Sequence, residues 1–343
     1  MITIKDIARE LDLSYASISL ALNDSHLIGE QTRLRVKQKA LEMGYVPNAS
    51  ARALVLRKTK IVGFILPDIR NPFFADLSRG AEEVAKEHGY NLLICNTDWD
   101  LELESLHLRL VEERKIDGIL IASSNAKNPI LERILSKNLP MVFVSSSYPH
   151  ATAPFIGADS VRGGYLAGRH LIELGHTNLA VVGGRFNSES VTRRYEGFRS
   201  AVRESRDARI TSVVYEGDFT VDSGYSSGKT LLKRSPEVTG IFAFNDLVAV
   251  GLLKALREAG VSVPGDVSIV GFDDIFISAL PGIELTTIHQ EKLLMGRRAM
   301  EVLLEQLEQG HSATSSADFE GESSSFAPTL VIRNTTGPAP QNR

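Results

Sequence analysis

The sequence has 343 residues, which is too long for one ordinary hydrophobic core, because cores stop growing at roughly 250–300 residues and longer chains divide into domains. Hydrophobic residues make up 43% of the chain and charged residues 23%, which excludes a disordered protein and indicates a soluble globular one. The single cysteine, Cys95, excludes an internal disulfide and a cysteine-based metal cluster, so we expect a reducing compartment and a buried thiol. No signal-peptide run and no apolar stretch of about 20 residues occurs, so we expect a cytoplasmic protein without a membrane segment.

The charge is divided unevenly along the chain. Residues 1–60 hold ten Lys and Arg against six Asp and Glu, a net charge of +4. Because the whole chain carries a net charge of −4, residues 61–343 carry −8. A small basic head on an acidic body indicates a polyanion-binding module attached to a separate body. Chance clustering of surface charge also explains so small an excess.

Three helices are predicted in the head. Thr3 with Asp6 three residues later resembles a capping box and starts the first helix. Ser14 caps a second helix after a tight turn, so the two form a helix-turn-helix whose second helix would enter the major groove of DNA. A third helix runs from about Glu30 and ends at Gly44. Its apolar positions are Leu34, Val36, Ala40 and Leu41.

The second helix presents a small polar face. Ile18, Ala21 and Leu22 fall on one side at the spacing that buries an apolar stripe. The other side carries hydroxyls, an amide and small apolar groups without charge, contributed by Tyr15, Ala16, Ser19, Leu20 and Asn23. Such groups suit the edges of DNA bases. The alternative is a three-helix bundle that binds another protein.

Four motifs in order carry a family resemblance. They are TIKDIA at 3–8, S-x-x-S-I-S-x-A-L-N at 14–23, GYVPN at 44–48 and ARAL at 51–54. Together they resemble the DNA-binding head and hinge of the LacI/GalR family of bacterial repressors. We therefore predict a helix-turn-helix head at 1–58 with a hinge helix at about 48–56.

The resemblance implies how the head contacts DNA. Tyr15 and Ala16 take the two leading base-reading positions, and Leu54 is the wedge that a pair of hinge helices inserts into the minor groove of a roughly palindromic operator. Leu20 stands where many members have Arg, which removes a guanine contact and leaves apolar contact with a thymine methyl as the substitute. The predicted DNA-binding set is Thr3, Ser14, Tyr15, Ala16, Ser19, Leu20, Asn23, Thr32, Asn48, Ala51, Arg52 and Leu54.

From residue 61 short apolar runs alternate with amphipathic helices. The runs lie at 61–66, 90–96, 117–123, 141–146 and 155–159, and a second series lies at 179–184, 210–217, 240–246 and 267–274. Continuous apolar strands separated by helices predict an α/β body of two lobes with doubly wound parallel sheets. We place the body at 61–343, with one lobe at about 61–160 and 290–320 and the other at about 163–288 and 325–337. Ligands of such sheets bind beyond the carboxyl ends of the strands, here between the lobes.

The family resemblance continues through the body, in NPFF at 71–74, GGYLAGRHLIELGH at 163–176, GFDD at 271–274 and LVIRNTTGP at 330–338. It implies a body like the periplasmic binding proteins that holds a small-molecule effector such as a sugar, nucleoside or related metabolite. The implied effector-binding residues are Phe73, Phe74, Ser124, Ser145, Arg194, Phe219, Asn245 and Asp273.

Several of these residues have simpler interpretations. Without the family, Arg194 would be a surface arginine and Asp273 a helix N-cap, and the two phenylalanines are as compatible with ordinary core as with ligand stacking. Ser145 replaces an Asp of many members, which argues against a common hexose bound in the usual way. For Trp99, the only tryptophan, we favour a rim or interface position over ligand stacking.

Enzyme motifs fail on spacing. Residues 224–230, GYSSGKT, have three residues between the glycines where a phosphate loop needs four, and they follow no strand. His170, His176 and His289 have neither metal-site nor triad spacing, so we expect no metal, no cofactor and no enzyme activity. The tail lacks heptads, which favours a homodimer over a tetramer. We therefore expect a transcriptional repressor whose partners are operator DNA and a small-molecule effector. The alternative is a periplasmic-type solute-binding protein without a transcriptional role.

Overall fold

The computed structural model describes residues 2–45, 58–113, 115–122, 128–137, 139–146, 153–184, 188–215, 217–309 and 324–341. The predicted hinge helix, with Asn48, Ala51, Arg52 and Leu54, lies outside the described residues, as does Ser124. The chain divides into two compact units, residues 1–59 and 60–343, which are the head and the body.

The described head is a small bundle of α1 (Ile4–Leu11), α2 (Tyr15–Leu22) and α3 (Glu30–Glu42). The backbone N–H and the hydroxyl of Thr3 both donate to Asp6, at 2.9 and 2.7 Å, and start α1. Ser14 Oγ accepts a hydrogen bond from the backbone N–H of Ser17 at 3.1 Å and starts α2. Gly44 has φ +66°, the left-handed conformation that a helix C-terminus favours in glycine. The core is formed by Ile7, Leu11, Ile18, Ala21, Val36 and Ala40.

Two of the apolar positions predicted for α3 do not face this core. Leu34 is 62% exposed and Leu41 is 83% exposed, so their assignment to a buried face was wrong. The reason is helical geometry: each residue turns the helix by about 100°, so Leu34 lies about 200° from Val36 and points away from the side that Val36 and Ala40 bury. Two of the four predicted positions therefore form the contact with α1 and α2.

The first lobe is built on a parallel sheet in the order β11-β5-β4-β3-β1-β2. Its strands are β1 (Ile61–Leu66), β2 (Asn91–Asn96), β3 (Gly118–Ile121), β4 (Met141–Val144), β5 (Phe155–Ala158) and β11 (Ser324–Phe326). One face is covered by α5 (Pro72–Glu87) and α12 (Lys292–Gln309), and the other by α6 (Leu101–Glu112) and α7 (Pro129–Ser136).

The second lobe repeats this plan with the order β12-β10-β9-β8-β6-β7. Its strands are β6 (Asn178–Val182), β7 (Arg209–Tyr215), β8 (Gly240–Ala243), β9 (Ser268–Asp273), β10 (Thr286–His289) and β12 (Thr329–Val331). The covering helices are α8 (Ser160–Glu173) and α9 (Glu189–Glu204) on one face and α10 (Val221–Arg234) and α11 (Asp246–Glu258) on the other, with a short 3-10 helix η1 (Phe276–Ala279). Among the strand pairs in the described part of the chain, β10 with β12 is antiparallel and the others are parallel.

The described chain passes between the lobes three times, from β5 to α8, from β10 to α12 and from β11 to β12. Each predicted apolar run overlaps a strand, whereas β10, β11 and β12 were not predicted. Ser325 and Phe326 pair with β5, so they lie in the first sheet and not in the second lobe, where we had placed them. The chain changes lobe between Phe326, which ends β11 in the first sheet, and Thr329, which begins β12 in the second.

Candidate functional site

A cavity lies between the two lobes, beyond the carboxyl ends of the strands. The empty space within it is about 450 Å³, a volume that includes the space at its open mouth. Its lining is aromatic and neutral apart from one arginine and one aspartate. The lining residues are Asn71, Phe73, Phe74, Trp99, Ala122, Ser145, Ser146, Ser188, Ser190, Arg194, Phe219, Asn245 and Asp273.

Seven of the eight residues that the resemblance implies for effector binding line this cavity, and the eighth, Ser124, lies outside the described residues. The structure therefore brings together side chains from positions as far apart in the sequence as Phe73 and Asp273. That they bind a ligand stays a prediction. Six further lining residues were not in the predicted set, namely Asn71, Trp99, Ala122, Ser146, Ser188 and Ser190.

The first lobe contributes the start of α5. Asn71 Oδ1 accepts from the backbone N–H of Phe73 at 3.0 Å, and Pro72 at the first helical position favours the same start. Phe73 and Phe74 are 3% and 8% exposed and meet edge to face, with centroids 5.1 Å apart. Both rings also belong to the core of the lobe, so they are at once core residues and cavity lining. The two interpretations offered by the sequence are not exclusive.

The second lobe contributes Arg194 from the inner face of α9. This side chain is not at the surface: the residue is 5% exposed, and its guanidinium lies 3.7 Å from the centre of the Phe272 ring. Its Nη2 faces Asp273 Oδ1 at 3.6 Å, and its Nη1 donates to the carbonyl of Phe244. The surface alternative for Arg194 was therefore wrong.

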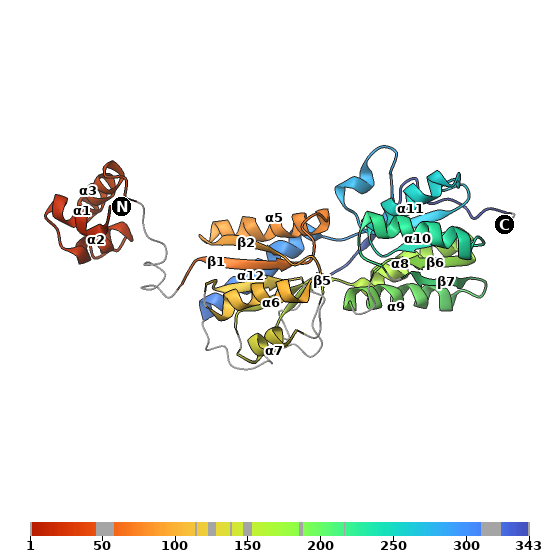
Figure 1. Cartoon of the computed structure of the whole chain (residues 1–343), viewed down its shortest axis with the longest axis horizontal. Coiled ribbons are helices and arrows are strands. Elements are labelled where there is room, and N and C mark those ends of the chain that lie inside the picture. Colours follow the sequence, from red (N-terminus) through yellow and green to blue (C-terminus); the bar gives the residue numbers. More distant parts are fainter. Residues whose placement is uncertain are drawn as a thin grey trace. The chain divides into compact units, whose positions relative to one another are not determined.

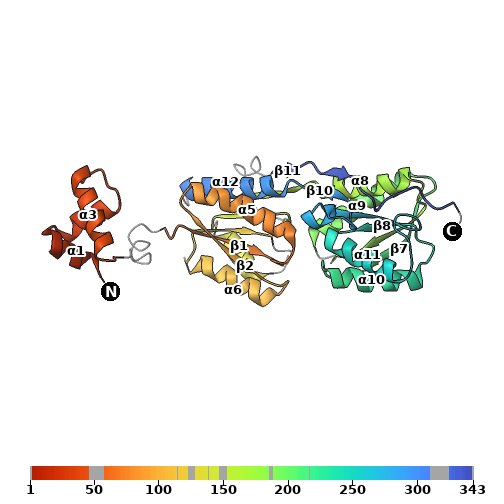
Figure 2. The same cartoon turned by 90° about the horizontal axis from the view of Figure 1, so that it is seen from above.

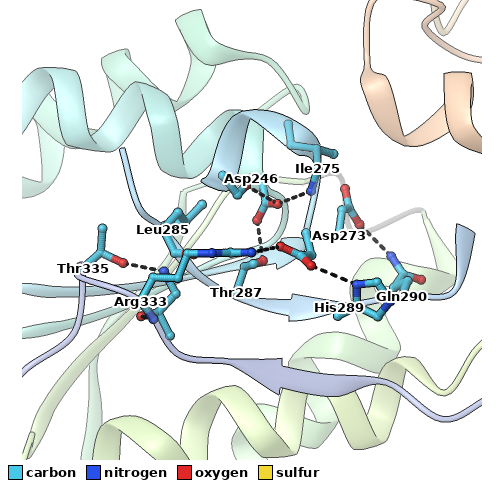
Figure 3. A network of polar contacts seen from close by, with 12 residues as sticks. Asp246, Asp273, Ile275, Leu285, Thr287, His289, Gln290, Arg333 and Thr335 are labelled. Atoms are coloured by element: carbon cyan, nitrogen blue, oxygen red, sulfur yellow. Dashed lines mark hydrogen bonds and ion pairs between the residues drawn. The ribbon is translucent and has the colours of Figure 1, made fainter. Parts of the chain in front are cut away.

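Asp273 is the last residue of β9, with φ +112°, and is not a helix N-cap. Gln290 Nε2 donates to its Oδ1 at 2.7 Å (Figure 3). Burial raises the pKa of Asp273 to about 6, against the opposing effect of the positive charges of Arg194 and Lys292. Lys292 Nζ donates to the carbonyls of Asp273 and Asp274, at 2.7 and 2.8 Å, and so ties the start of α12 to the end of β9.

A second buried carboxylate, Asp246, lies behind Asp273. Its Oδ1 accepts from Thr287 Oγ1 at 2.5 Å, and its Oδ2 accepts from the backbone N–H of Ile275 at 2.9 Å and from Ser278 Oγ at 2.7 Å (Figure 3). Burial, followed by the negative charge of Asp273, raises the pKa of Asp246 to about 7. Asp246 therefore ties the start of α11 to β10, to η1 and to the segment after β9, and holds the wall of the cavity in place.

Asn245 and Trp99 line the cavity in different ways. Asn245 starts α11, with its Oδ1 accepting from the N–H of Val248 at 2.9 Å and its Nδ2 donating to the carbonyl of Phe219 at 3.1 Å. Trp99 stacks on the Phe219 ring. The rim position that we favoured for Trp99 agrees with its partial exposure at the cavity, where its stacking partner is a side chain of the protein.

Two polar groups of the cavity lining lack a hydrogen-bond partner among the described residues. They are Ser146 Oγ and Arg194 Nε, and both residues are more than nine-tenths buried. Buried polar groups are almost always paired, so an unpaired group in a cavity points to a ligand. Sequence reasoning could have found the hydroxyls at 188 and 190 from their place at the start of a helix, but nothing in the sequence distinguishes Ser146.

In the head, α2 exposes the predicted reading face. Tyr15 is 56% exposed, Ala16 is also exposed, and Ser19 and Leu20 are partly exposed. Three predicted contact residues are engaged within the head: Thr3 Oγ1 donates to Asp6, Ser14 Oγ accepts from the N–H of Ser17, and Asn23 Nδ2 donates to the carbonyl of Ser19 at 2.8 Å. The exposed face of α2 therefore presents apolar groups and hydroxyls beside the exposed Tyr15, and it carries no charged group.

The positive charge of the head is not spread over its helices. Residues 2–45 contain six Lys and Arg and six Asp and Glu, so the net charge of +4 arises from Arg52, Arg57, Lys58 and Lys60. Within the helices, Lys37 pairs with Asp24 at 2.5 Å and Lys39 with Glu42 at 2.8 Å. The basic excess inferred from the sequence therefore belongs to the predicted hinge and the junction.

The described residues provide no group of three or more metal-ligating side chains, and no described helix is both long and apolar enough to cross a membrane. The glycine-containing run at 224–230 lies within α10, as the sequence indicated. His170 and His176 make structural hydrogen bonds, to Thr336 at 3.0 Å and to Thr239 at 3.0 Å.

Comparison with known proteins identifies both units. Residues 3–48 match the family of bacterial regulatory proteins named after LacI, and residues 59–323 match the periplasmic binding proteins and sugar-binding domain of the LacI family. The repressor PurR of Aliivibrio salmonicida is 36% identical over 313 residues, 91% of this chain and 94% of its own. The regulator DegA of Bacillus subtilis is 36% identical over 297 residues, 86% of this chain and 88% of its own.

A solved structure agrees with these relatives. A LacI-family transcriptional regulator from Enterococcus faecium with bound ribose has a TM-score of 0.71 and 32% identity, over 81% of this chain and 99% of its own. The family, the fold and the function of a ligand-controlled DNA-binding regulator are thereby confirmed, and a solute-binding protein without a head does not account for residues 3–48. The chain belongs to the LacI family of bacterial transcriptional regulators.

Proposed function

We propose that this regulator is a cytoplasmic homodimeric repressor that binds a roughly palindromic operator, and that a small molecule bound between the lobes controls its operator affinity. The head and hinge at 1–58 would bind DNA, and the body at 61–343 would bind the effector and the second protomer. The observation that carries the proposal is the cavity at the lobe boundary, which gathers seven of the residues implied for effector binding.

The lining favours a neutral, polar effector with a flat or apolar face. Phe73, Phe74, Trp99 and Phe219 offer rings, and the other uncharged polar groups are serine hydroxyls and asparagine amides. Arg194 and Asp273 face each other at 3.6 Å, so their charges largely cancel for an incoming ligand. Sugars, nucleosides and related metabolites fit this chemistry, and the ribose-bound relative supports the same class.

The reading face of α2 supports an operator with its own sequence preference. Tyr15 and Ala16 project from the exposed start of the helix, and Leu20 offers only a methyl-bearing side chain where the family often has Arg. We expect an A·T pair at the base that Leu20 meets, because the thymine methyl is the apolar group of the major groove. Selection of bound duplexes from a random library would show it: a palindrome with G·C at that position contradicts this assignment.

The DNA-binding proposal is tested by a salt titration. If a dimer neutralises about 6–10 phosphates, affinity for the selected operator should fall by about 10³ or more between 50 and 200 mM salt. Leu54→Ala should weaken binding to this operator far more than binding to random duplex, because only specific binding uses the wedge. Equal loss on both duplexes, or no salt dependence, contradicts the proposal.

The effector is sought by a thermal-shift screen of D-ribose, cellobiose, adenosine, guanosine, adenine and hypoxanthine, followed by operator binding with and without each hit. Arg194→Met should abolish the shift, and the exposed neighbour variant Arg193→Met should keep it. A hit that binds both variants equally would not occupy this cavity. A hit that leaves operator affinity unchanged would contradict its role as the effector.

A further inference from the structure

The stacked pair Trp99–Phe219 joins the two lobes. Trp99 lies between β2 and α6 of the first lobe, and Phe219 lies between β7 and α10 of the second. Their ring centroids are 5.0 Å apart and the ring planes differ by 21°. Both side chains line the cavity, so this aromatic contact bridges the cleft at the effector site itself.

The loop that carries Trp99 is built to hold its ring in place. Thr97 donates twice to the carbonyl of Leu66 at the end of β1, from its N–H at 3.0 Å and from its hydroxyl at 3.4 Å. Asp100 then caps α6 through the N–H groups of the next turn. Between these anchors, Asp98 and Trp99 have φ of +48° and +63°. Two successive non-glycine residues in this region are unfavourable, and such strain is concentrated at binding sites.

The partner ring is anchored equally well. The carbonyl of Phe219 accepts from Asn245 Nδ2 at 3.1 Å, and its ring packs against the core of the second lobe. Each ring is therefore fixed to its own lobe, and a change in the angle between the lobes must separate the rings or slide one over the other.

The stack lies at the mouth of the cavity. Phe73, Phe74 and Arg194 are less than 9% exposed, whereas Trp99 and Phe219 are both partly exposed. Stacked atoms approach to about 3.5–4 Å, so a flat ligand between two rings needs a separation of about 7 Å. The observed 5.0 Å leaves no room for it.

We propose that the Trp99–Phe219 stack is an inter-lobe latch of the effector site: it holds the lobes together without ligand, and an entering ligand separates the rings. Trp99 is thereby assigned to the effector site. This inference rests on the proposed function, since it supposes that the cavity receives the effector. The latch itself is a property of the ligand-free protein, so its existence can be tested separately.

The first experiment uses the full chain without ligand. Trp99 is the only tryptophan, so emission and acrylamide quenching report on this ring alone. Phe219→Leu should shift the emission to longer wavelength and raise the quenching constant about twofold. Phe276→Leu, at a phenylalanine that is 68% exposed on η1, should change neither. Circular dichroism establishes that both variants are folded. Folded Phe219→Leu protein with wild-type emission and quenching overturns the latch.

The second experiment adds D-ribose or adenosine to the wild-type protein, with binding measured independently by calorimetry. A probe that binds should change Trp99 emission and raise its quenching toward the value of ligand-free Phe219→Leu. Binding that leaves Trp99 unchanged overturns the opening of the latch but leaves the effector proposal intact. Binding by neither probe counts against the proposed effector class, while the ligand-free comparison still decides whether the latch exists.

Discussion

Replacing Arg194 tests whether its buried charge maintains Asp273 as a carboxylate. Arg194→Met keeps a side chain of similar reach on α9 but removes the ion pair at 3.6 Å and the hydrogen bond to the carbonyl of Phe244. Losing one partner of a buried ion pair costs about 3–5 kcal/mol when the other charge stays. Lys292 and Gln290 remain beside Asp273, so we expect the total loss of stability at alkaline pH to lie near the lower end of this range.

The loss should depend on pH. Burial raises the folded pKa of Asp273 above its ordinary value to about 6, so in the wild type Asp273 costs stability as pH rises from about 4 to 6, and that cost is level above 6. Without Arg194 the folded pKa rises further, and the cost continues to grow up to pH 8. The further loss of stability between pH 6 and pH 8 is largest if Asp273 stays protonated over both pH units. Each unit then costs about 1.4 kcal/mol, so the further loss cannot exceed about 3 kcal/mol.

At pH 5 Asp273 is largely protonated, so the loss of stability in Arg194→Met comes only from the unpaired carbonyl of Phe244 and from lost packing. We expect this loss to be about 1–3 kcal/mol. The assay is urea unfolding at pH 5, 6, 7 and 8, followed by far-ultraviolet circular dichroism. The matched control is Arg193→Met on the same helix. Its guanidinium is 52% exposed and pairs with Glu189 at 3.1 Å, so we expect at most about 1 kcal/mol at every pH. Equal losses in both variants, or a loss at Arg194 that is flat from pH 5 to 8, would refute the reasoning.

Three further changes probe the head, the inner carboxylate and the thiol. Ser14→Ala removes the acceptor of the Ser17 N–H and should cost the head about 1 kcal/mol, seen as a lower melting temperature of its calorimetric transition; an unchanged transition contradicts the cap. Asp246→Asn should flatten the fall in stability between pH 4 and 7, because burial raises the pKa of Asp246 to about 7 and an amide does not ionise; an unchanged pH slope in thermal melts contradicts this. Burial raises the pKa of Cys95 to about 11, so a disulfide reagent at pH 8 should label it slowly in native protein and at once in urea; immediate native labelling would show an open site.

Strands buried on both faces could be predicted from the sequence because they read as continuous apolar runs. The run at 61–66 is β1 without a residue of difference. The strands that were missed are short and polar: β10 begins with Thr286 and Thr287, and β11 is Ser324–Phe326. Their position is set by pairing with β9 and β5, which is a property of the assembled sheet and not of local composition.

The position of the cavity between the lobes follows from the strand pattern, but the residues that line it were predictable only through the family resemblance, since their chemistry alone favoured other roles. The burial of Arg194 could have been predicted from the sequence. It shares one buried face of α9, at helical spacing, with three apolar residues: Val191, Phe198 and Val202. An arginine on the apolar face of a helix needs a buried partner. The sequence gives no such pattern for Trp99, whose place depends on two left-handed residues in a loop.

The distance between the cavity and the start of the body restricts how effector binding at the cavity can affect the DNA-binding head. β1 begins at Ile61, one residue after Lys60, and its other end leads to the cavity residues Phe73 and Phe74. Lys60 is fixed to the first lobe, since its N–H donates to Asp117 Oδ2 at 2.9 Å and its ammonium lies 4.0 Å from the centre of the Tyr90 ring.

Six residues of strand span about 20 Å, and this strand is hydrogen-bonded on both sides, so it does not stretch or bend locally when a ligand binds. A change at the cavity must therefore displace Lys60 by moving the first lobe as a body. In the proposed homodimer such a movement would alter the separation of the two first lobes, and with it the predicted pairing of the two hinge segments on DNA. Separating the Trp99–Phe219 stack is the step that frees the first lobe to make this movement.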